Sequence, residues 1–267
     1  MLAIVATPIG NLDDMTLRAI RVLRESDIVL AEDTRHTQKL LKHHGIERER
    51  GSVQSYHEHN AESRTEWALT RLGEGLKIAL VTDAGTPAIS DPGYRLVRAV
   101  RAAGIPVEPI PGPCAAVAAL SASGLPSDRF TFVGFPPKKS GARRRWLDGL
   151  STVTGSIVMY ASGRDVPNVL AGILETRGDV PTALARELTK QYEEWLTGPV
   201  SEVLADWRAN PRKGEVTIVL DRPPETVVDD VALSELLETH SVAEVVEITG
   251  VSKRRVYQLS IQKKKNR

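Results

Sequence analysis

The stretch from Ile78 to Gly93 constrains the fold more than any other part of the chain. Its apolar start, Ile78 to Val81, is typical of a buried strand, which passes at Asp83 into a loop of small, turn-forming residues. We expect Asp91 to cap the next helix, with Pro92 in the first turn, where proline loses no hydrogen bond. Open α/β sheets build binding crevices from such strand–loop–helix units, at the carboxyl ends of their strands.

Two residues make this loop a candidate ligand site. Gly85 offers backbone without a side chain where a ligand would approach, and Asp83 places a carboxylate at the strand tip. A tight connection without a ligand is the alternative, because Gly, Pro and Asp are ordinary turn residues. The neighbouring segments favour a site.

Apolar runs alternate with helical segments throughout the first half of the chain. The expected strands are Leu2–Ala6, Ile28–Ala31, Val53–Ser55, Ile78–Val81 and Val107–Ile110. The expected helices include Thr34–His44, one that ends near Leu72, one that ends at Gly104, and Cys114–Ala122. This alternation predicts a mostly parallel sheet.

A second α/β pattern begins near Phe130. Its expected strands are Thr131–Val133, Ser156–Tyr160, Thr182–Ala185 and Val216–Leu220, with helices between them and a break at Gly198-Pro199. After Arg222-Pro223-Pro224, a linker by composition, the chain is expected to be helical. We therefore predict an N-terminal α/β domain (1–120), a C-terminal α/β domain (121–224) and a helix-turn-helix-like tail (225–267).

Composition excludes several classes of protein. The net charge of the 267 residues is +1, so global charge predicts no partner. Cys114 is the only cysteine, which excludes an internal disulfide and a cysteine-based metal site and suits the cytosol. We expect neither a signal peptide nor a membrane span, and predict a cytoplasmic protein without a metal.

Carboxylates dominate the loops that follow the first-domain strands. They are Asp13, Asp14, Glu32, Asp33, Asp83 and Asp91. Neither a GxxxxGK[ST] motif nor a GxGxxG spacing is present, and a nucleotide phosphate would meet these acids unless Mg²⁺ intervened. S-adenosylmethionine suits them better, because it carries an adenosine, an α-amino acid and a positive sulfonium but no phosphate.

Ordered motifs over nearly the whole chain resemble one family. They are Ala6–Thr16, Ala31–Thr37, Ser55–Asn60, Asp83–Gly93, Pro111–Pro113 and Ala185–Lys190. The chain is similar to the ribosomal RNA small subunit methyltransferase I family, a branch of the tetrapyrrole-methylase superfamily. The resemblance implies 2′-O-methylation of a cytidine in the decoding region of 16S rRNA, in the 30S subunit. It also implies two α/β domains of the tetrapyrrole-methylase type with S-adenosylmethionine in the cleft between them, and a homodimer.

The resemblance also assigns residues to the cofactor site. They are Pro8, Asp83, Gly85, Thr86, Cys114, Ala115, Tyr160, Ala161, Glu187, Leu188 and Thr217. One segment departs from the family pattern, which usually continues Glu-Ser-Pro-His-Arg after the strand that ends at Tyr160. This chain has Ala161-Ser162-Gly163-Arg164-Asp165, which argues against an essential catalytic role there or makes this member different.

A ribose hydroxyl must lose its proton during methyl transfer, and a positioned base typically adds about 10²–10⁴ in rate. The candidates are Glu187, Lys190 with a lowered pKa, and His57 or His59. Glu187 and Lys190 could equally form a structural ion pair. For His57 and His59 a hydrogen-bonding pair is favoured over a metal site, because no third ligand is evident.

Two basic runs could contact RNA phosphates. The first holds Arg129, Lys138, Lys139, Arg143, Arg144 and Arg145, and the second holds Lys253, Arg254 and Arg255 with Lys263, Lys264, Lys265 and Arg267. Solvated faces are the alternative. Val242–Leu259 resembles a helix-turn-helix with Gly250 in the turn and Ser252 as N-cap, although a plain helical bundle would look the same.

Two other functions remain open at this level. A methyltransferase that acts on a tetrapyrrole would leave the basic runs and the helical tail without a role. A non-catalytic RNA-binding assembly factor that keeps the pocket would differ from both enzymes if it bound no S-adenosylmethionine.

Overall fold

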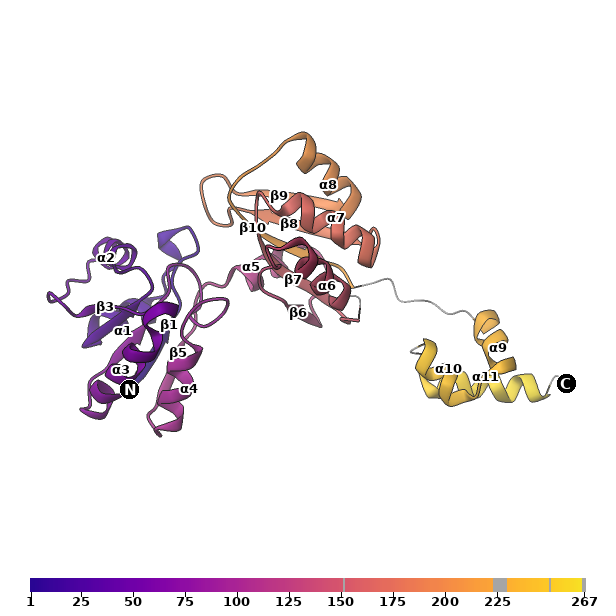
Figure 1. The fold of residues 1–267 in the computed structure, drawn as a ribbon, viewed down its shortest axis with the longest axis horizontal. Coiled ribbons are helices and arrows are strands. Elements are labelled where there is room, and N and C mark those ends of the chain that lie inside the picture. Colours follow the sequence, from indigo (N-terminus) through magenta and orange to yellow (C-terminus); the bar gives the residue numbers. More distant parts are fainter. Residues whose placement is uncertain (151, 223–229, 250, 266–267) are drawn as a thin grey trace. The chain divides into compact units, whose positions relative to one another are not determined.

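The computed structural model describes residues 1–267 except 151, 223–229, 250 and 266–267. The described chain forms two compact units, Met1–Asp221 and Arg222–Arg267 (Figure 1). The larger unit contains two five-stranded sheets. In the smaller unit, the described residues form helices and no strand.

The first sheet is parallel throughout and has the strand order β3-β2-β4-β1-β5. The elements of this lobe are β1 (Leu2–Val5), η1 (Leu12–Asp14), α1 (Leu17–Glu25), β2 (Ile28–Ala31), α2 (Thr34–His43), β3 (Val53–Ser55), η2 (Glu58–Asn60), α3 (Ala61–Gly73), β4 (Ile78–Leu80), α4 (Tyr94–Ala102) and β5 (Val107–Ile110). The parallel sheet predicted from alternating strands and helices is confirmed. Its strands are short apolar runs because helices cover both faces.

Each face of this sheet has its own core. Leu23 of α1 and Leu40 of α2 pack with Val5 on one face. Leu72 of α3 and Leu96 of α4 pack with Leu2 on the other. Because all five strands run the same way, the loops that follow them gather at one edge of the sheet, where open α/β folds bind ligands.

The second sheet is mixed and has the order β6-β7-β10-β8-β9. The elements of this lobe are α5 (Ala115–Ala122), β6 (Phe130–Phe132), α6 (Ser140–Leu150), β7 (Ser156–Ser162), α7 (Val166–Arg177), β8 (Pro181–Arg186), β9 (Glu194–Pro199), α8 (Val200–Ala209) and β10 (Glu215–Leu220). Strands β6 and β7 pair in parallel. The pairs β7–β10, β10–β8 and β8–β9 are antiparallel.

The interpretation of Gly198-Pro199 as a break between helices is wrong. Both residues end β9, an edge strand that pairs with β8 from Pro181↔Pro199 to Arg186↔Glu194. An edge strand tolerates proline because one side of its ladder needs no donor. Helix α8 starts directly afterwards, at Val200.

The small unit is a bundle of α9 (Asp230–Thr239), α10 (Val242–Thr249) and α11 (Lys253–Lys265) around Leu233, Val245 and Val256. A capping box starts α10, since Ser241 N donates to Glu244 Oε2 at 2.7 Å and Glu244 N donates to Ser241 Oγ at 3.3 Å. Ser252 immediately precedes α11, as predicted. The predicted turn residue Gly250 and the linker prolines Pro223 and Pro224 lie outside the described residues. Across the described helices, none combines the length and apolar character that a bilayer crossing requires.

Candidate active site

A pocket of about 280 Å³ lies between the loops at the edge of the parallel sheet and strands β7, β8 and β10 of the mixed sheet. Its lining residues are Ile9, Glu32, Asp83, Ala84, Gly85, Thr86, Ile89, Ser90, Asp91, Cys114, Ala115, Phe135, Tyr160, Ala161, Ala185, Leu188, Lys190, Glu215, Val216 and Thr217. The carboxyl ends of parallel strands therefore meet a second sheet across a shared cavity, as expected for a ligand site.

A short bridge between two loops fixes one wall of the pocket. Thr7 N donates to Gly85 O at 2.9 Å, and Gly85 N donates to Thr7 O at 3.0 Å. The Thr7 hydroxyl also donates to Thr82 O at 3.0 Å, and the Thr86 hydroxyl donates to Pro113 O at 3.1 Å. Gly85 has φ +85°, a conformation that side chains rarely adopt. The backbone conformation at this position therefore requires glycine. The N–H and the C=O of Gly85 are both already hydrogen-bonded to Thr7.

Carboxylates from two loops of the parallel-sheet lobe reach the pocket: Glu32 from the loop after β2, and Asp83 and Asp91 from the loop after β4. Glu215 of β10 lines it from the mixed sheet. Asp33 N donates to Asp83 Oδ1 at 3.0 Å, and the Thr82 hydroxyl donates to Glu32 Oε2 at 2.8 Å. Burial raises the pKa of Asp83. Burial, together with the charges of Glu32 and Asp83, raises the pKa of Asp91 to about 6. Within the described residues, no group of three or more His, Cys, Asp or Glu side chains is arranged to hold a metal ion.

Asp91 does not cap α4, contrary to the sequence prediction. The helix starts at Tyr94, and its N-cap is Gly93 with φ +138°. A Cβ at Gly93 would lie 2.9 Å from Leu80 Cδ2, so the loop packs tightly against β4. Ala88 and Ser90 also have positive φ, 70° and 61°. This unusual backbone carries Asp91 into the pocket, and strain of this kind gathers at functional sites.

Lys190 enters the pocket from the loop after β8 and is held by two carboxylates. Its Nζ lies 3.1 Å from Glu187 Oε1 and 2.7 Å from Glu215 Oε2. Burial lowers the pKa of Lys190, but these hydrogen bonds outweigh it and raise the pKa overall. The expectation of a lowered pKa for a basic Lys190 is therefore wrong. The pKa of Glu187 is lowered, since hydrogen bonds from Glu215 N and Lys190 outweigh its desolvation.

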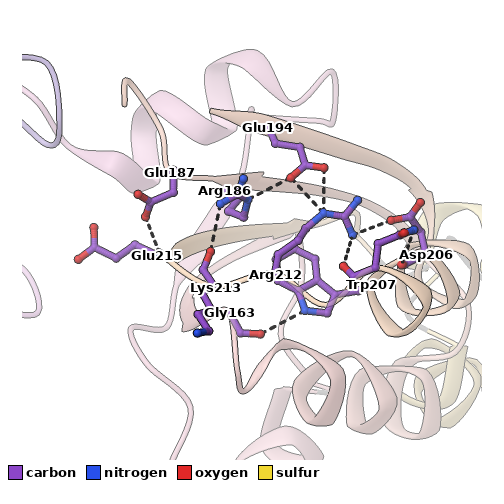
Figure 2. Close-up of polar contacts among 10 residues, drawn as sticks. Gly163, Arg186, Glu187, Glu194, Asp206, Trp207, Arg212, Lys213 and Glu215 are labelled. Carbon is purple, nitrogen blue, oxygen red and sulfur yellow. Dashed lines mark hydrogen bonds and ion pairs between the residues drawn. The ribbon is translucent and has the colours of Figure 1, made fainter. Parts of the chain in front are cut away.

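A polar network next to this loop holds it in place (Figure 2). Glu194 on β9 accepts from Arg186 Nε at 3.0 Å and from Arg212 Nε at 2.9 Å. Arg212 also lies 2.8 Å from Asp206, and its guanidinium stacks 5.3 Å from the ring centroid of Trp207. Arg186, Glu194 and Arg212 are only partly exposed, so the ion pairs of Glu194 are stronger than ordinary surface pairs, whereas Asp206 is exposed.

Figure 2 also shows how Gly163, in the segment that departs from the family pattern, is held by Trp207. The Trp207 indole donates to Gly163 O at 3.1 Å. A Cβ at residue 163 would lie 2.7 Å from Arg212 O, so only glycine fits without a shift. At Gly163 this segment therefore lies directly against the 212–213 backbone.

Most of the proposed cofactor residues line the pocket. They are Asp83, Gly85, Thr86, Cys114, Ala115, Tyr160, Ala161, Leu188 and Thr217. Pro8 is buried and Glu187 faces Lys190 and Glu215 N, and neither lines the pocket. The Tyr160 hydroxyl accepts from Ala116 N at 3.1 Å, and burial raises its pKa.

Sequence reasoning missed several lining residues. Glu32 and Asp91 stood among the loop carboxylates, but nothing in the sequence separated them from Asp13, Asp14 and Asp33, which do not line the pocket. Asp33 instead caps α2 through Arg35 N at 2.8 Å. His57 and His59 pack edge to face at 6.0 Å and lie outside the pocket lining.

The predicted RNA-contacting residues Lys138, Lys139, Arg144, Arg145, Lys253, Arg254 and Arg255 are exposed, whereas Arg143 is half-buried. Lys138 and Lys139 are exposed just before α6, which carries Arg143, Arg144 and Arg145. Arg144 pairs with Glu175 of α7 at 3.0 Å, so it is less available than its neighbours. In the small unit, Lys253, Arg254 and Arg255 start α11 and are exposed, and Arg255 pairs with Asp230 at 2.8 Å.

The chemistry of the pocket selects against phosphate. Glu32, Asp83 and Asp91 supply negative charge, while Lys190 is already neutralised by two glutamates. A ligand with positive charge and an apolar body matches this lining, which also offers Ile9, Leu188 and Phe135. S-adenosylmethionine has these properties.

Comparisons with known proteins now identify the family. The model of the Tetrapyrrole (Corrin/Porphyrin) Methylases matches residues 1–204. The Ribosomal RNA small subunit methyltransferase I of Escherichia coli O157:H7 is 44% identical over 98% of this chain and 94% of its own length. That of Micromonospora olivasterospora is 42% identical over 96% of this chain and 85% of its own length. The chain belongs to the ribosomal RNA small subunit methyltransferase I family. It is a methyltransferase, as predicted from the motifs.

Solved structures share the fold at low sequence identity. The cobalt precorrin-4 methyltransferase of cobalamin biosynthesis has a TM-score of 0.61 and 20% identity, over 82% of this chain and 94% of that one. A uroporphyrin-III C-methyltransferase from Thermus thermophilus complexed with S-adenyl homocysteine has a TM-score of 0.56 and 19% identity, over 82% and 96%. These likenesses confirm the predicted tetrapyrrole-methylase fold.

Proposed function

We propose that this chain transfers the methyl group of S-adenosylmethionine to the ribose 2′-hydroxyl of a cytidine in the decoding region of 16S rRNA. The observation that carries the proposal is the carboxylate-lined pocket at the edge of the parallel sheet. It occurs in a chain 44% identical, over nearly its full length, to a protein named as a small subunit rRNA methyltransferase.

Residues from both sheets of the larger unit would contact the cofactor. Asp83 and Thr86 offer polar contacts on one side, where Gly85 leaves room because it has no side chain, and Leu188 and Thr217 close the other. S-adenosylmethionine, when bound, supplies a methyl group activated by a sulfonium. Fixing that group and the acceptor oxygen in line is the main contribution of the protein, since orientation can supply roughly 7–11 kcal/mol.

The acceptor RNA needs cations beyond the pocket. We assign this role to the exposed run that includes Lys138, Lys139 and Arg145, and to Lys253 and Arg254 of the small unit. Such contacts supply affinity without sequence information. Assembled 30S subunits as the substrate, a homodimer and a cytoplasmic location belong to the same proposal.

Methyl transfer from radiolabelled S-adenosylmethionine tests this function. The purified chain is incubated with 30S subunits, with protein-free 16S rRNA and with uroporphyrinogen III in parallel. We expect label in the 30S rRNA and none in the tetrapyrrole. Label in the tetrapyrrole would favour a metabolic methyltransferase, and cofactor binding without any transfer would favour an assembly factor.

A further inference from the structure

A second pocket, of about 540 Å³, opens beside the first. It lies entirely within the lobe of the parallel sheet, and its lining residues are Tyr56, Glu58, Ala61, Ala88, Ser90, Asp91, Pro92, Gly93, Tyr94 and Arg95. Only Ser90 and Asp91 belong to the linings of both pockets. Asp91 is therefore the one ionisable side chain in these linings that faces both spaces.

The surroundings of Asp91 make it a weak acid poised for proton transfer. Glu32 after β2 and Asp83 after β4 face it with negative charge, the Thr82 hydroxyl lies beside it, and Tyr160 of β7 lies across the first pocket. Burial is the largest cause that brings its pKa to about 6. A general base is most effective when its pKa lies near the working pH.

The second pocket offers the groups that hold a single-stranded nucleotide. Tyr94, the first residue of α4, is 59% exposed, and Arg98 Nη1 lies 3.5 Å from its hydroxyl. Arg95 is exposed next to it. Within the described residues, no carboxylate forms an ion pair with Arg95 or Arg98. An exposed aromatic ring can stack on a base, and unpaired guanidinium groups can meet phosphates.

We propose that the second pocket receives the target nucleotide, stacked on Tyr94, and that Asp91 in the shared wall accepts the proton of its 2′-hydroxyl. This assignment rests on the proposed function. As the ribose oxygen bonds to the methyl carbon, the methyl–sulfur bond breaks and its electron pair stays on sulfur. The hydroxyl proton moves to an Asp91 carboxylate oxygen, which later releases it to water.

The other candidate bases are less suited to this role. Glu187 and Lys190 are paired with each other, and the raised pKa of Lys190 keeps it protonated. Asp83 lines only the first pocket, and Glu58 lines only the second. These two carboxylates provide matched controls for Asp91.

Three variants separate the roles: Asp91→Asn, Asp83→Asn and Glu58→Gln. Each is assayed for kcat and KM on 30S subunits across pH, for S-adenosylmethionine affinity by calorimetry, and for RNA affinity by filter binding. We expect Asp91→Asn to lower kcat by about 10²–10⁴ and to abolish the acid limb of the pH profile. Its affinities for both ligands should stay within about tenfold of wild type. Asp83→Asn should weaken cofactor binding and keep the acid limb. Glu58→Gln removes a charge from the wall of the second pocket, so it should change RNA affinity and KM while cofactor affinity and the acid limb stay as in wild type.

A second pair tests the nucleotide pocket without catalysis. Tyr94→Ala should weaken RNA binding by about 5- to 150-fold, the loss of one stacked base, whereas Tyr94→Phe should bind like wild type. Equal RNA affinity of Tyr94→Ala and wild type would overturn the pocket assignment. An Asp91→Asn enzyme that keeps its kcat or its acid limb would overturn the catalytic role. If the wild type itself transfers no methyl group to rRNA, the proposed function fails. If the wild type is active and Asp91→Asn is equally active, only the role of Asp91 fails.

Discussion

Replacing Asp91 by asparagine should stabilise the fold at neutral pH. The pKa of this carboxyl is raised from 3.8 to about 6 by burial and by Glu32 and Asp83, so the folded chain binds the proton more tightly than the unfolded chain. The contribution of Asp91 to the free energy of unfolding is therefore highest below pH 3.8, the pKa in the unfolded chain, where both states carry the proton. It falls as the pH rises through about 6, the pKa in the folded chain, where the native carboxyl loses the proton. At neutral pH the ionised carboxylate therefore destabilises the native state, and asparagine removes that cost.

The size of the effect follows from the shift. A difference of about 2 pKa units corresponds to about 3 kcal/mol. Asp91 is only partly buried, and solvent screening reduces this to about 1–2 kcal/mol. For a chain of this size, about 1 kcal/mol shifts the melting temperature by roughly 2–4 °C. We expect the melting temperature of Asp91→Asn to exceed that of the wild type by about 2–8 °C near pH 7.5.

Differential scanning calorimetry from about pH 4 to pH 8 measures this difference. The gain should shrink as pH falls through about 6 and vanish near the unfolded pKa. Glu58→Gln, an exposed carboxylate of the second pocket, serves as the matched control and should show little gain. A gain that does not depend on pH, or a loss of stability at neutral pH, would refute this reasoning.

Three further changes test other parts of the site. Asp83→Ala should weaken S-adenosylmethionine binding by about 10- to 150-fold, equivalent to the roughly 1.5–3 kcal/mol of a charged hydrogen bond, and unchanged affinity by calorimetry would remove Asp83 from the site. Gly85→Val should lower both the melting temperature and cofactor affinity, because φ +85° strains a β-branched residue; loss of affinity alone would contradict this. Changing Arg143, Arg144 and Arg145 together to serine should flatten the salt dependence of RNA binding by roughly one unit of slope per lost phosphate contact, whereas Arg208→Ser on α8 should not.

The strands and their loops could be predicted because local sequence determines them. The run from Ile78 to Val81 has to be buried, and its end at Asp83 follows from the loss of apolar residues. The N-terminal strands therefore lie within a residue or two of their expected positions. Strand β9 was missed because Gly198 and Pro199 resemble a break, and only pairing with β8 shows that they belong to an edge.

The roles of individual site residues depend on contacts between distant segments. Asp91 was expected as a cap because Asp-Pro commonly starts helices, but positive φ at Ala88 and Ser90 turns it into the pocket instead. The raised pKa of Lys190 depends on Glu215, which lies on another strand. Neither feature has a signature in local sequence, although the family motifs mark the loops that contain both residues.

Nucleoside mass spectrometry of 16S rRNA tests the central claim most directly. The rRNA is taken from a strain that lacks the gene for this chain and from the same strain complemented with it. The account predicts that one 2′-O-methylcytidine in the decoding region disappears in the deletion strain and returns on complementation. An unchanged 2′-O-methylcytidine content, or the loss of a base-methylated nucleoside instead, would contradict it.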